Sequence, residues 1–197
     1  MRLLTTALLI AGLGTAAHAE DIKSVYTELD TNKDCTAFEP MEEGSESVSL
    51  VCNGYGGYPI FIYAGDLRES WYFGFPKGEY VWEGFSAFNN GGPKVEWRVS
   101  SDGGKVLPFA TIHRYFVSDT EDAEKKTEVL VVAKVGQIEE QDGCAVGLVM
   151  ATGNPKANDT ARKIADEQAR GFQCGGDERV LVGDNIPEFS RSDEARE

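Results

Sequence analysis

The sequence predicts an α+β fold, a mostly antiparallel β-sheet or sandwich of about eight strands with one principal C-terminal helix packed on it and two disulfides. Apolar and polar residues alternate over 95–100, as in a strand with one buried face. Residues 144–151 form an apolar run of strand length, and a polar turn at 152–155 separates it from a helical pattern. The cysteines are even in number, which predicts disulfides if the chain is exported.

Other segments have the length and composition of strands. Residues 129–135 are nearly all apolar, which predicts a central strand. Asp102-Gly103 is a tight-turn signal and predicts a hairpin that joins the strand at 95–100 to a strand at 109–117. The remaining expected strands are at 22–29 (with a short helix as the alternative), 48–53, 59–64 and 180–182.

The principal helix is expected to begin at Pro155 and to end at Gly171. Six residues recur at helical spacing and form the face that packs on the sheet, namely Ala157, Ala161, Ile164, Ala165, Gln168 and Phe172. Charged residues fill the opposite side, which we interpret as a solvated face: Arg162, Lys163, Asp166, Glu167 and Arg170.

Four cysteines allow three pairings. The strand at 144–151 spans about 26 Å and the helix about 21 Å, so an antiparallel return brings Cys174 beside Cys144. We therefore expect the disulfides Cys35–Cys52 and Cys144–Cys174, each closing a local unit. The cysteines have neither Cys-x-x-Cys nor zinc-like spacing, and Pro59 interrupts the glycine pattern of a dinucleotide site. The sequence thus predicts no metal site and no cofactor.

The chain begins like an exported protein. Arg2 precedes an apolar run at 3–17, and Ala17-His18-Ala19 has the small-x-small pattern of a cleavage site. We expect residues 1–19 to be a signal peptide, 20–183 to be one globular domain and 184–197 to be a flexible polar tail. The expected location is the periplasm or the medium, with no attachment to the membrane after cleavage.

The composition is strongly acidic, with 33 Asp and Glu against 19 Lys and Arg and a formal net charge of −14. This charge argues against a nucleic-acid partner, which requires clustered Lys and Arg. It also disfavours anionic membrane surfaces. It permits a cationic partner, and it also favours solubility in general.

Aromatic residues gather between Tyr55 and Trp97, where they are interleaved with glycines. Consecutive aromatics on a strand point to both faces, so some are exposed unless another layer covers them. Exposed aromatics on glycine-rich segments can stack on sugars or anchor a partner. The candidate contact residues are Trp71, Tyr72, Trp82 and Phe85. The alternative is that these side chains form a second core cluster.

Signals for catalysis are few. His113 is the only histidine after the signal peptide, and no Gly-x-Ser-x-Gly segment is present. A pair of carboxylates could support hydrolysis of a glycoside, but the sequence does not select two among the 33 acidic residues. No catalytic residue is therefore assigned.

One further pattern carries a resemblance. It runs Cys144, Ala157-Asn158, Ala161-Arg162, Ile164-Ala165-Asp166, Ala169, Phe172, Cys174-Gly175 and Asp177, and it is accompanied by Ser24-Val25-Tyr26-Thr27, Gly57-Tyr58-Pro59 and Gly65-Asp66-Leu67-Arg68. The pattern resembles one found in small exported proteins of alphaproteobacteria. The resemblance implies a bacterial, exported origin and brings no activity, ligand or catalytic residue with it.

These observations favour an exported, non-enzymatic binding protein whose partner is a protein or a glycan. One alternative is a periplasmic inhibitor of a cationic cell-wall hydrolase such as lysozyme, which compartment, size and charge suggest. The alternative from another class is a small hydrolase that uses His113 or a pair of carboxylates.

Overall fold

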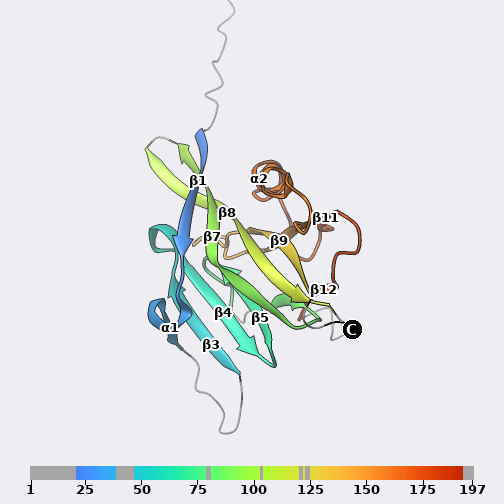
Figure 1. Ribbon diagram of the computed structural model, residues 1–197. Helices are drawn as coiled ribbons and strands as arrows, with labels where there is room; N and C mark the ends of the chain where they lie inside the picture. The colour runs from blue at the N-terminus through green and yellow to red at the C-terminus, as the bar shows by residue number, and fades with distance from the viewer. Residues whose placement is uncertain are drawn as a thin grey trace, which may run out of the picture.

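The computed structural model describes residues 21–192, apart from 39–46, 79–80, 103, 120–121 and 123–124. The predicted signal peptide therefore lies outside the described residues. The predicted fold class is confirmed, because strands dominate the fold, pair mostly antiparallel and carry one long helix (Figure 1). Neither helix in the described part of the chain has the length and apolar composition that a membrane span requires.

The strands of the described residues form two main sheets and one small one. The larger sheet has the order β1 (Asp21–Glu28), β7 (Asn89–Asp102), β8 (Lys105–Ser118), β9 (Lys126–Lys134), β10 (Cys144–Met150) and β11 (Val180–Val182). The smaller sheet has the order β2 (Cys35–Ala37), β3 (Val48–Asn53), β4 (Pro59–Gly65) and β5 (Arg68–Phe73). β6 (Glu83–Phe85) pairs with β12 (Phe189–Arg191), and the helices are α1 (Thr31–Asp34) and α2 (Ala157–Gln168).

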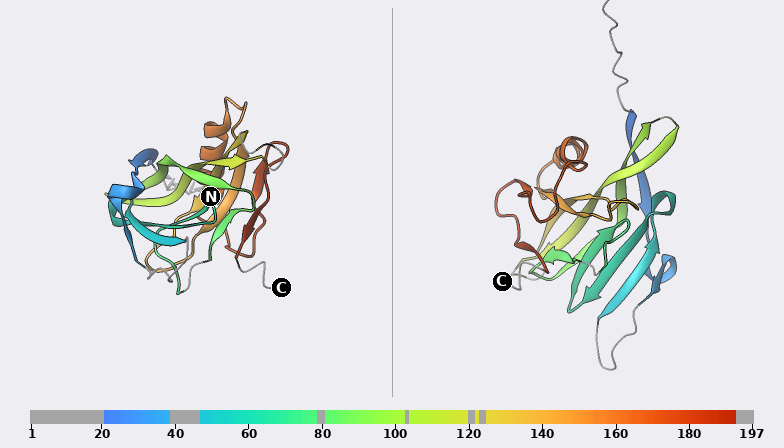
Figure 2. Two further views of the ribbon diagram at one scale, coloured as in Figure 1. Left: turned by 60° about the horizontal axis from the view of Figure 1, so that its bottom comes forward. Right: turned by 180° about the vertical axis from the view of Figure 1, so that it is seen from behind.

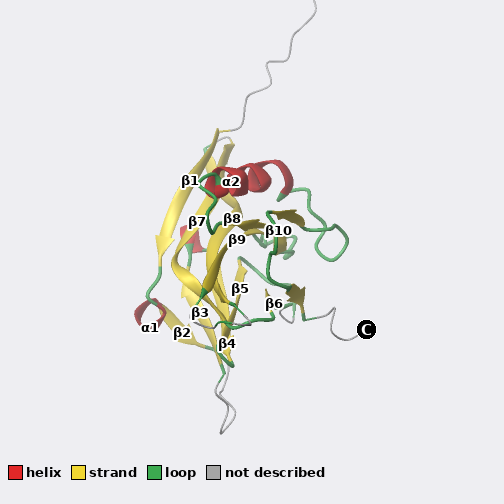
Figure 3. Ribbon diagram, turned by 45° about the vertical axis from the view of Figure 1, so that its right-hand side comes forward, coloured by secondary structure: helices red, strands yellow, loops and turns green. Residues whose placement is uncertain are grey.

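The larger sheet is the middle layer of the molecule. The smaller sheet lies against one of its faces and α2 lies against the other (Figure 3). Strand β9 shows why the sequence required this, since Val129 and Val131 face the core between the sheets while Leu130 and Val132 face α2. An apolar residue at every position is stable only in a strand that is covered on both sides. The predicted central strand at 129–135 is confirmed, with β8 and β10 as its neighbours.

Strand β7 differs from the expectation at 95–100. Val95, Trp97 and Val99 face the core between the sheets, as the alternation predicts. Glu96 and Arg98, which alternation assigns to solvent, are only 6% and 8% exposed. They are buried because charged residues of α2 cover them and form ion pairs with them. The interpretation of Arg162 and Asp166 as part of a solvated helix face is therefore wrong.

Both predicted disulfides are confirmed. Cys35 and Cys52 lie directly opposite each other on β2 and β3, with 4.1 Å between their Cα atoms. Cys144 begins β10 and is bonded to Cys174, which follows α2, with 5.7 Å between the Cα atoms. The predicted return of the chain after the helix thus occurs. α2 itself is shorter than expected, because it begins at Ala157 and ends at Gln168 rather than at Gly171.

The chain remains ordered beyond the predicted domain end at residue 183. Phe189–Arg191 form strand β12, whose residues pair antiparallel with Glu83–Phe85 of β6 (Figure 2). The expectation of a flexible tail from residue 184 is therefore wrong for this segment. A three-residue strand carries little sequence signal, and its partner is about a hundred residues away, so its pairing depends on long-range packing.

Candidate functional site

Three of the four candidate aromatic residues belong to the core. Trp71, Tyr72 and Phe85 are 8%, 7% and 3% exposed, whereas Trp82 is half-buried. The predicted contact surface is therefore wrong for these three residues, and the core alternative holds for them. Trp71 and Phe85 belong to the core between the sheets, where Trp71 packs on the ring of His113, and the Tyr72 hydroxyl donates to Phe75 O at 3.2 Å.

A different set of large side chains is exposed in the same part of the chain. Tyr63, Leu67 and Phe88 are 38%, 73% and 42% exposed, and they surround the turn between β4 and β5. The ring of Tyr63 lies 5.9 Å from that of Trp82, with 37° between the two planes. Trp82 is thus the one predicted contact residue that lies at an accessible aromatic cluster.

The β4–β5 turn has an unusual backbone. Gly65 pairs with Arg68, so Asp66 and Leu67 make a two-residue loop, and both have positive φ angles, 47° and 57°. Asn and Gly are the usual residues in such a turn, because a left-handed conformation strains other side chains. Because Leu67 is exposed, no burial of its side chain offsets the strain of this conformation. Backbone strain of this kind is concentrated at functional sites in proteins generally, which makes this turn a candidate site.

A groove runs along one side of the turn, and we call it the serine groove. Its volume is about 610 Å³. The aromatic pair Tyr63 and Trp82 lies at this groove together with five serines, Ser47, Ser70, Ser86, Ser190 and Ser192. The remaining lining residues are Gly65, Asp66, Arg68, Gly84, Phe85 and Arg191. Serine hydroxyls both donate and accept hydrogen bonds, so the groove offers polar contacts of both kinds beside an aromatic pair.

A second hollow, of about 540 Å³, lies on the other side of Arg68 and contains Leu67 and Phe88. Arg68 lines both hollows and is held in place by its neighbours. Its Nε donates to Ser86 O at 2.8 Å, its Nη1 donates to Asp66 O at 3.0 Å, and its guanidinium lies 4.8 Å from the centre of the Phe88 ring. The arginine is therefore a fixed donor group between the two hollows.

The far wall of the serine groove is anchored by a buried ion pair. Arg179 Nη2 donates to Glu83 Oε1 at 2.8 Å, and the backbone N–H of Ala145 donates to Glu83 Oε2. Burial raises the pKa of Glu83, against the opposing effect of Arg179. Glu83 follows Trp82 directly and starts β6, so this anchor fixes the strand that carries the tryptophan and the strand β12 that pairs with it.

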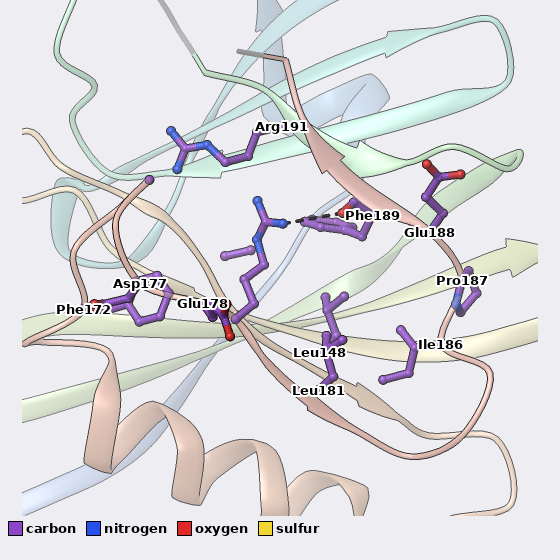
Figure 4. Close-up of a pocket in the computed structure, with 13 residues that line it drawn as sticks. Leu148, Phe172, Asp177, Glu178, Leu181, Ile186, Pro187, Glu188, Phe189 and Arg191 are labelled. Carbon is purple, nitrogen blue, oxygen red and sulfur yellow. Dashed lines mark hydrogen bonds between the residues drawn. The ribbon is translucent and has the colours of Figure 1, made fainter. Parts of the chain in front are cut away.

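Arg179 also belongs to a third pocket, which the C-terminal segment closes (Figure 4). This pocket has a volume of about 480 Å³, with Leu148, Leu181 and Ile186 close together on one side and Arg191 apart from them. Arg191 lines the serine groove as well. The pocket mixes apolar residues with charges of both signs, including Asp177, Glu178 and Glu188, so its composition does not select one class of ligand.

His113 lies in the core between the two sheets. Its side chain is 1% exposed, its ring centre is 4.1 Å from that of Trp71, and its Nε2 is 2.8 Å from Gly92 O. Burial lowers the pKa of His113 to about 4. A catalytic histidine must meet its substrate, and this ring meets only protein. The hydrolase alternative is therefore wrong as far as it used His113.

The described residues contain no group of three His, Cys, Asp or Glu side chains that could hold a metal ion. No protein-family model, no curated protein and no solved structure matches this chain. The resemblance to exported alphaproteobacterial proteins thus stays a prediction, although one of its segments, Gly65-Asp66-Leu67-Arg68, is the strained turn at the site.

The sequence pointed to the right segment but, apart from Trp82, to the wrong side chains. A two-residue hairpin at Asp66-Leu67 could have been recognised from the polar turn between two apolar runs. The five serines could not, since they come from segments far apart in the chain.

Proposed function

We propose that this chain is an exported, non-enzymatic binding protein and that its serine groove takes a glycan. The observation that carries the proposal is the pairing of Tyr63 with Trp82 at a groove that also holds five serines. The C–H faces of a pyranose ring pack well on aromatic rings, and its hydroxyls exchange hydrogen bonds with serine and arginine. A glycan uses both features at once.

The groove is also suited to binding because its walls are rigid. Tyr63, Arg68 and Ser70 are on paired strands of the smaller sheet, while Ser190 and Arg191 are on β12. Side chains on paired strands lose little freedom on binding, which favours affinity. A groove that places serines, Asp66 and two arginines beside an aromatic pair suits a hydroxyl-rich ligand better than a flat apolar protein surface does.

The acidic charge supports the second reading that the sequence left open, an inhibitor of a cationic cell-wall hydrolase. Under that reading Leu67, exposed at the tip of its turn, would enter the cleft of the enzyme. The charge favours encounter with any cationic protein, however, and by itself selects no binding mode. We therefore keep this reading as an outcome of the test below.

The test is calorimetric titration of the mature protein with soluble tetrasaccharides built from N-acetylglucosamine, glucose or galactose. We expect at least one of them to bind. Tyr63→Ala and Trp82→Ala should each weaken that binding by about tenfold, the loss expected for one well-packed aromatic contact. Tyr26→Ala is the matched control, because Tyr26 is 52% exposed on β1 and does not line the groove.

Two outcomes would contradict the proposal. One is the absence of saccharide binding together with tight capture of lysozyme, which would favour the inhibitor reading. The other is an equal loss of affinity in the Tyr63→Ala and Tyr26→Ala variants, which would place the binding elsewhere on the surface.

A further inference from the structure

A fourth hollow, chemically different from the others, lies at the C-terminal end of α2, on the helix-bearing face of the larger sheet. It forms where the helix ends, and residues of β7, β8 and β9 line it. The cleft has a volume of about 340 Å³ and is lined by Ser100, Lys105, Leu107, Phe109, Lys134, Val135, Gln137, Glu140 and Arg170. We call it the basic cleft, because it contains three cationic side chains in a protein whose net charge is −14.

Lys134 is a buried cation in the lining of this cleft. It is only 8% exposed, and its Nζ donates to Asp142 Oδ2 at 2.9 Å and to Phe172 O at 3.0 Å. An ammonium group has three N–H donors, so these two partners leave room for a third acceptor. Asp142 already shares the charge of this ammonium, but little water screens it, so an anionic third acceptor gains a charge-assisted hydrogen bond.

Arg170 and Lys105 add positive charge around the opening. The Arg170 guanidinium lies 3.6 Å from the centre of the Phe109 ring, which holds it at the cleft. Lys105 is exposed and is on the same face of β8 as Leu107 and Phe109. Two carboxylates lie close to these cations, Glu140 in the lining and Asp142 on Lys134.

The floor of the cleft is apolar. Phe109 is 6% exposed and packs in the core under α2, and Leu107 is half-buried beside it. A ligand that satisfies both the floor and the cations has an apolar body that carries an anionic group. The volume is at the lower end of the range for small-molecule sites, about 300–1,000 Å³.

From this geometry we propose that the basic cleft binds a small organic anion, a carboxylate attached to a flat apolar body. The carboxylate pairs with Lys134 and Arg170, and the apolar body lies on Leu107 and the edge of Phe109. This site is independent of the serine groove, with which it shares no lining residue.

The test compares two probes of nearly the same shape, 2-naphthoate and 2-naphthamide, by calorimetric titration of the mature protein. We expect the naphthoate to bind and the uncharged amide to bind about tenfold more weakly, because the amide lacks the charge-assisted hydrogen bonds. Lys105→Ala and Arg170→Ala should each weaken binding of the naphthoate, and Arg170→Ala should have the larger effect. Both side chains are exposed enough to be removed without unfolding the protein.

Lys163→Ala is the matched control, because it removes one positive charge from an exposed position of α2 that does not line the cleft. It should leave the affinity for the naphthoate unchanged. Equal binding of naphthoate and naphthamide would overturn the proposal, as would an equal loss of affinity in the Lys163→Ala and Arg170→Ala variants. Absence of naphthoate binding at millimolar concentration would overturn it as well.

Discussion

Arg98 of β7 and Asp166 of α2 form a two-pronged ion pair, with 2.7 Å from Nε to Oδ1 and 2.7 Å from Nη2 to Oδ2. Beside it, Arg162 of α2 pairs with Glu96 of β7 through contacts of 2.6 and 3.1 Å. Two residues along a strand and four along a helix both correspond to about 6–7 Å, so the pairs can form next to each other. Ser24 of β1 contacts both strand residues at 2.5 Å.

These ion pairs predict a large loss of stability when one partner is removed. Asp166→Ala should lower the free energy of unfolding by about 3 kcal/mol, because it removes both short contacts of the buried Arg98 guanidinium to a carboxylate and leaves only Glu96 at 4.0 Å. The Arg98→Ala/Asp166→Ala double variant should lose less than the sum of the single losses. Urea unfolding with the disulfides intact measures all three. Lys94, whose ion pair with Glu28 is exposed, is the control, and Lys94→Ala should leave the unfolding midpoint unchanged. Additive effects of Arg98→Ala and Asp166→Ala would contradict the coupling.

His113 predicts a specific dependence of stability on pH. Burial lowers its pKa from 6.5 to about 4, so in that range the unfolded chain binds the proton more readily than the folded one. The stability contributed by the neutral histidine is present above pH 6.5 and is lost as the pH falls toward 4, by about 3 kcal/mol in total. The free energy of unfolding of His113→Gln, measured beside the wild type, should therefore approach the wild-type value as the pH falls. The carboxylates titrate in both proteins and cancel in the comparison. A difference that stays constant over this range would contradict the assignment.

The burial of the aromatic residues predicts which of their substitutions lower the stability of the protein. Trp71→Ala and Phe85→Ala should each cost about 3–5 kcal/mol of stability, because both side chains are buried in the core between the sheets. Tyr63→Ala and Phe88→Ala remove exposed side chains and should change stability by less than about 0.5 kcal/mol. Thermal unfolding of the four variants separates the classes. A large loss for Tyr63→Ala would mean that this side chain is kept for packing rather than for contact.

The strained turn predicts that a glycine at position 67 stabilises the protein. Leu67→Gly should raise stability by up to about 1 kcal/mol, because glycine adopts the positive φ without the steric cost that leucine has. The gain is smaller than the strain itself, since glycine also makes the unfolded chain more flexible. Leu67→Ala keeps the strain and is the control. Leu67 lines the second hollow and not the serine groove, so neither variant should weaken saccharide binding, whereas only Leu67→Gly should be more stable. Equal stabilities for the two variants would remove the argument from strain.

The sequence by itself determined the parts of the fold that depend on local pattern. The unbroken apolar run of β9 required a strand covered on both faces, and Asp102-Gly103 required a hairpin between β7 and β8. The spacing of the strand and helix that separate Cys144 from Cys174 brought these two cysteines together. In each case the signal lies within a few turns or residues of chain, where backbone geometry alone restricts the outcome.

Only the tertiary structure decided which faces are covered. Alternation correctly placed Glu96 and Arg98 on one side of β7, but it could not reveal that Arg162 and Asp166 would lie over them. In the same way, Trp71 and Phe85 are buried because distant segments of the chain cover them, including the larger sheet and β12. Tyr63, on a neighbouring strand, remains exposed. Periodicity gives the direction of a side chain within its own element. Whether that direction leads to solvent, to a partner or to a groove depends on which distant element packs there.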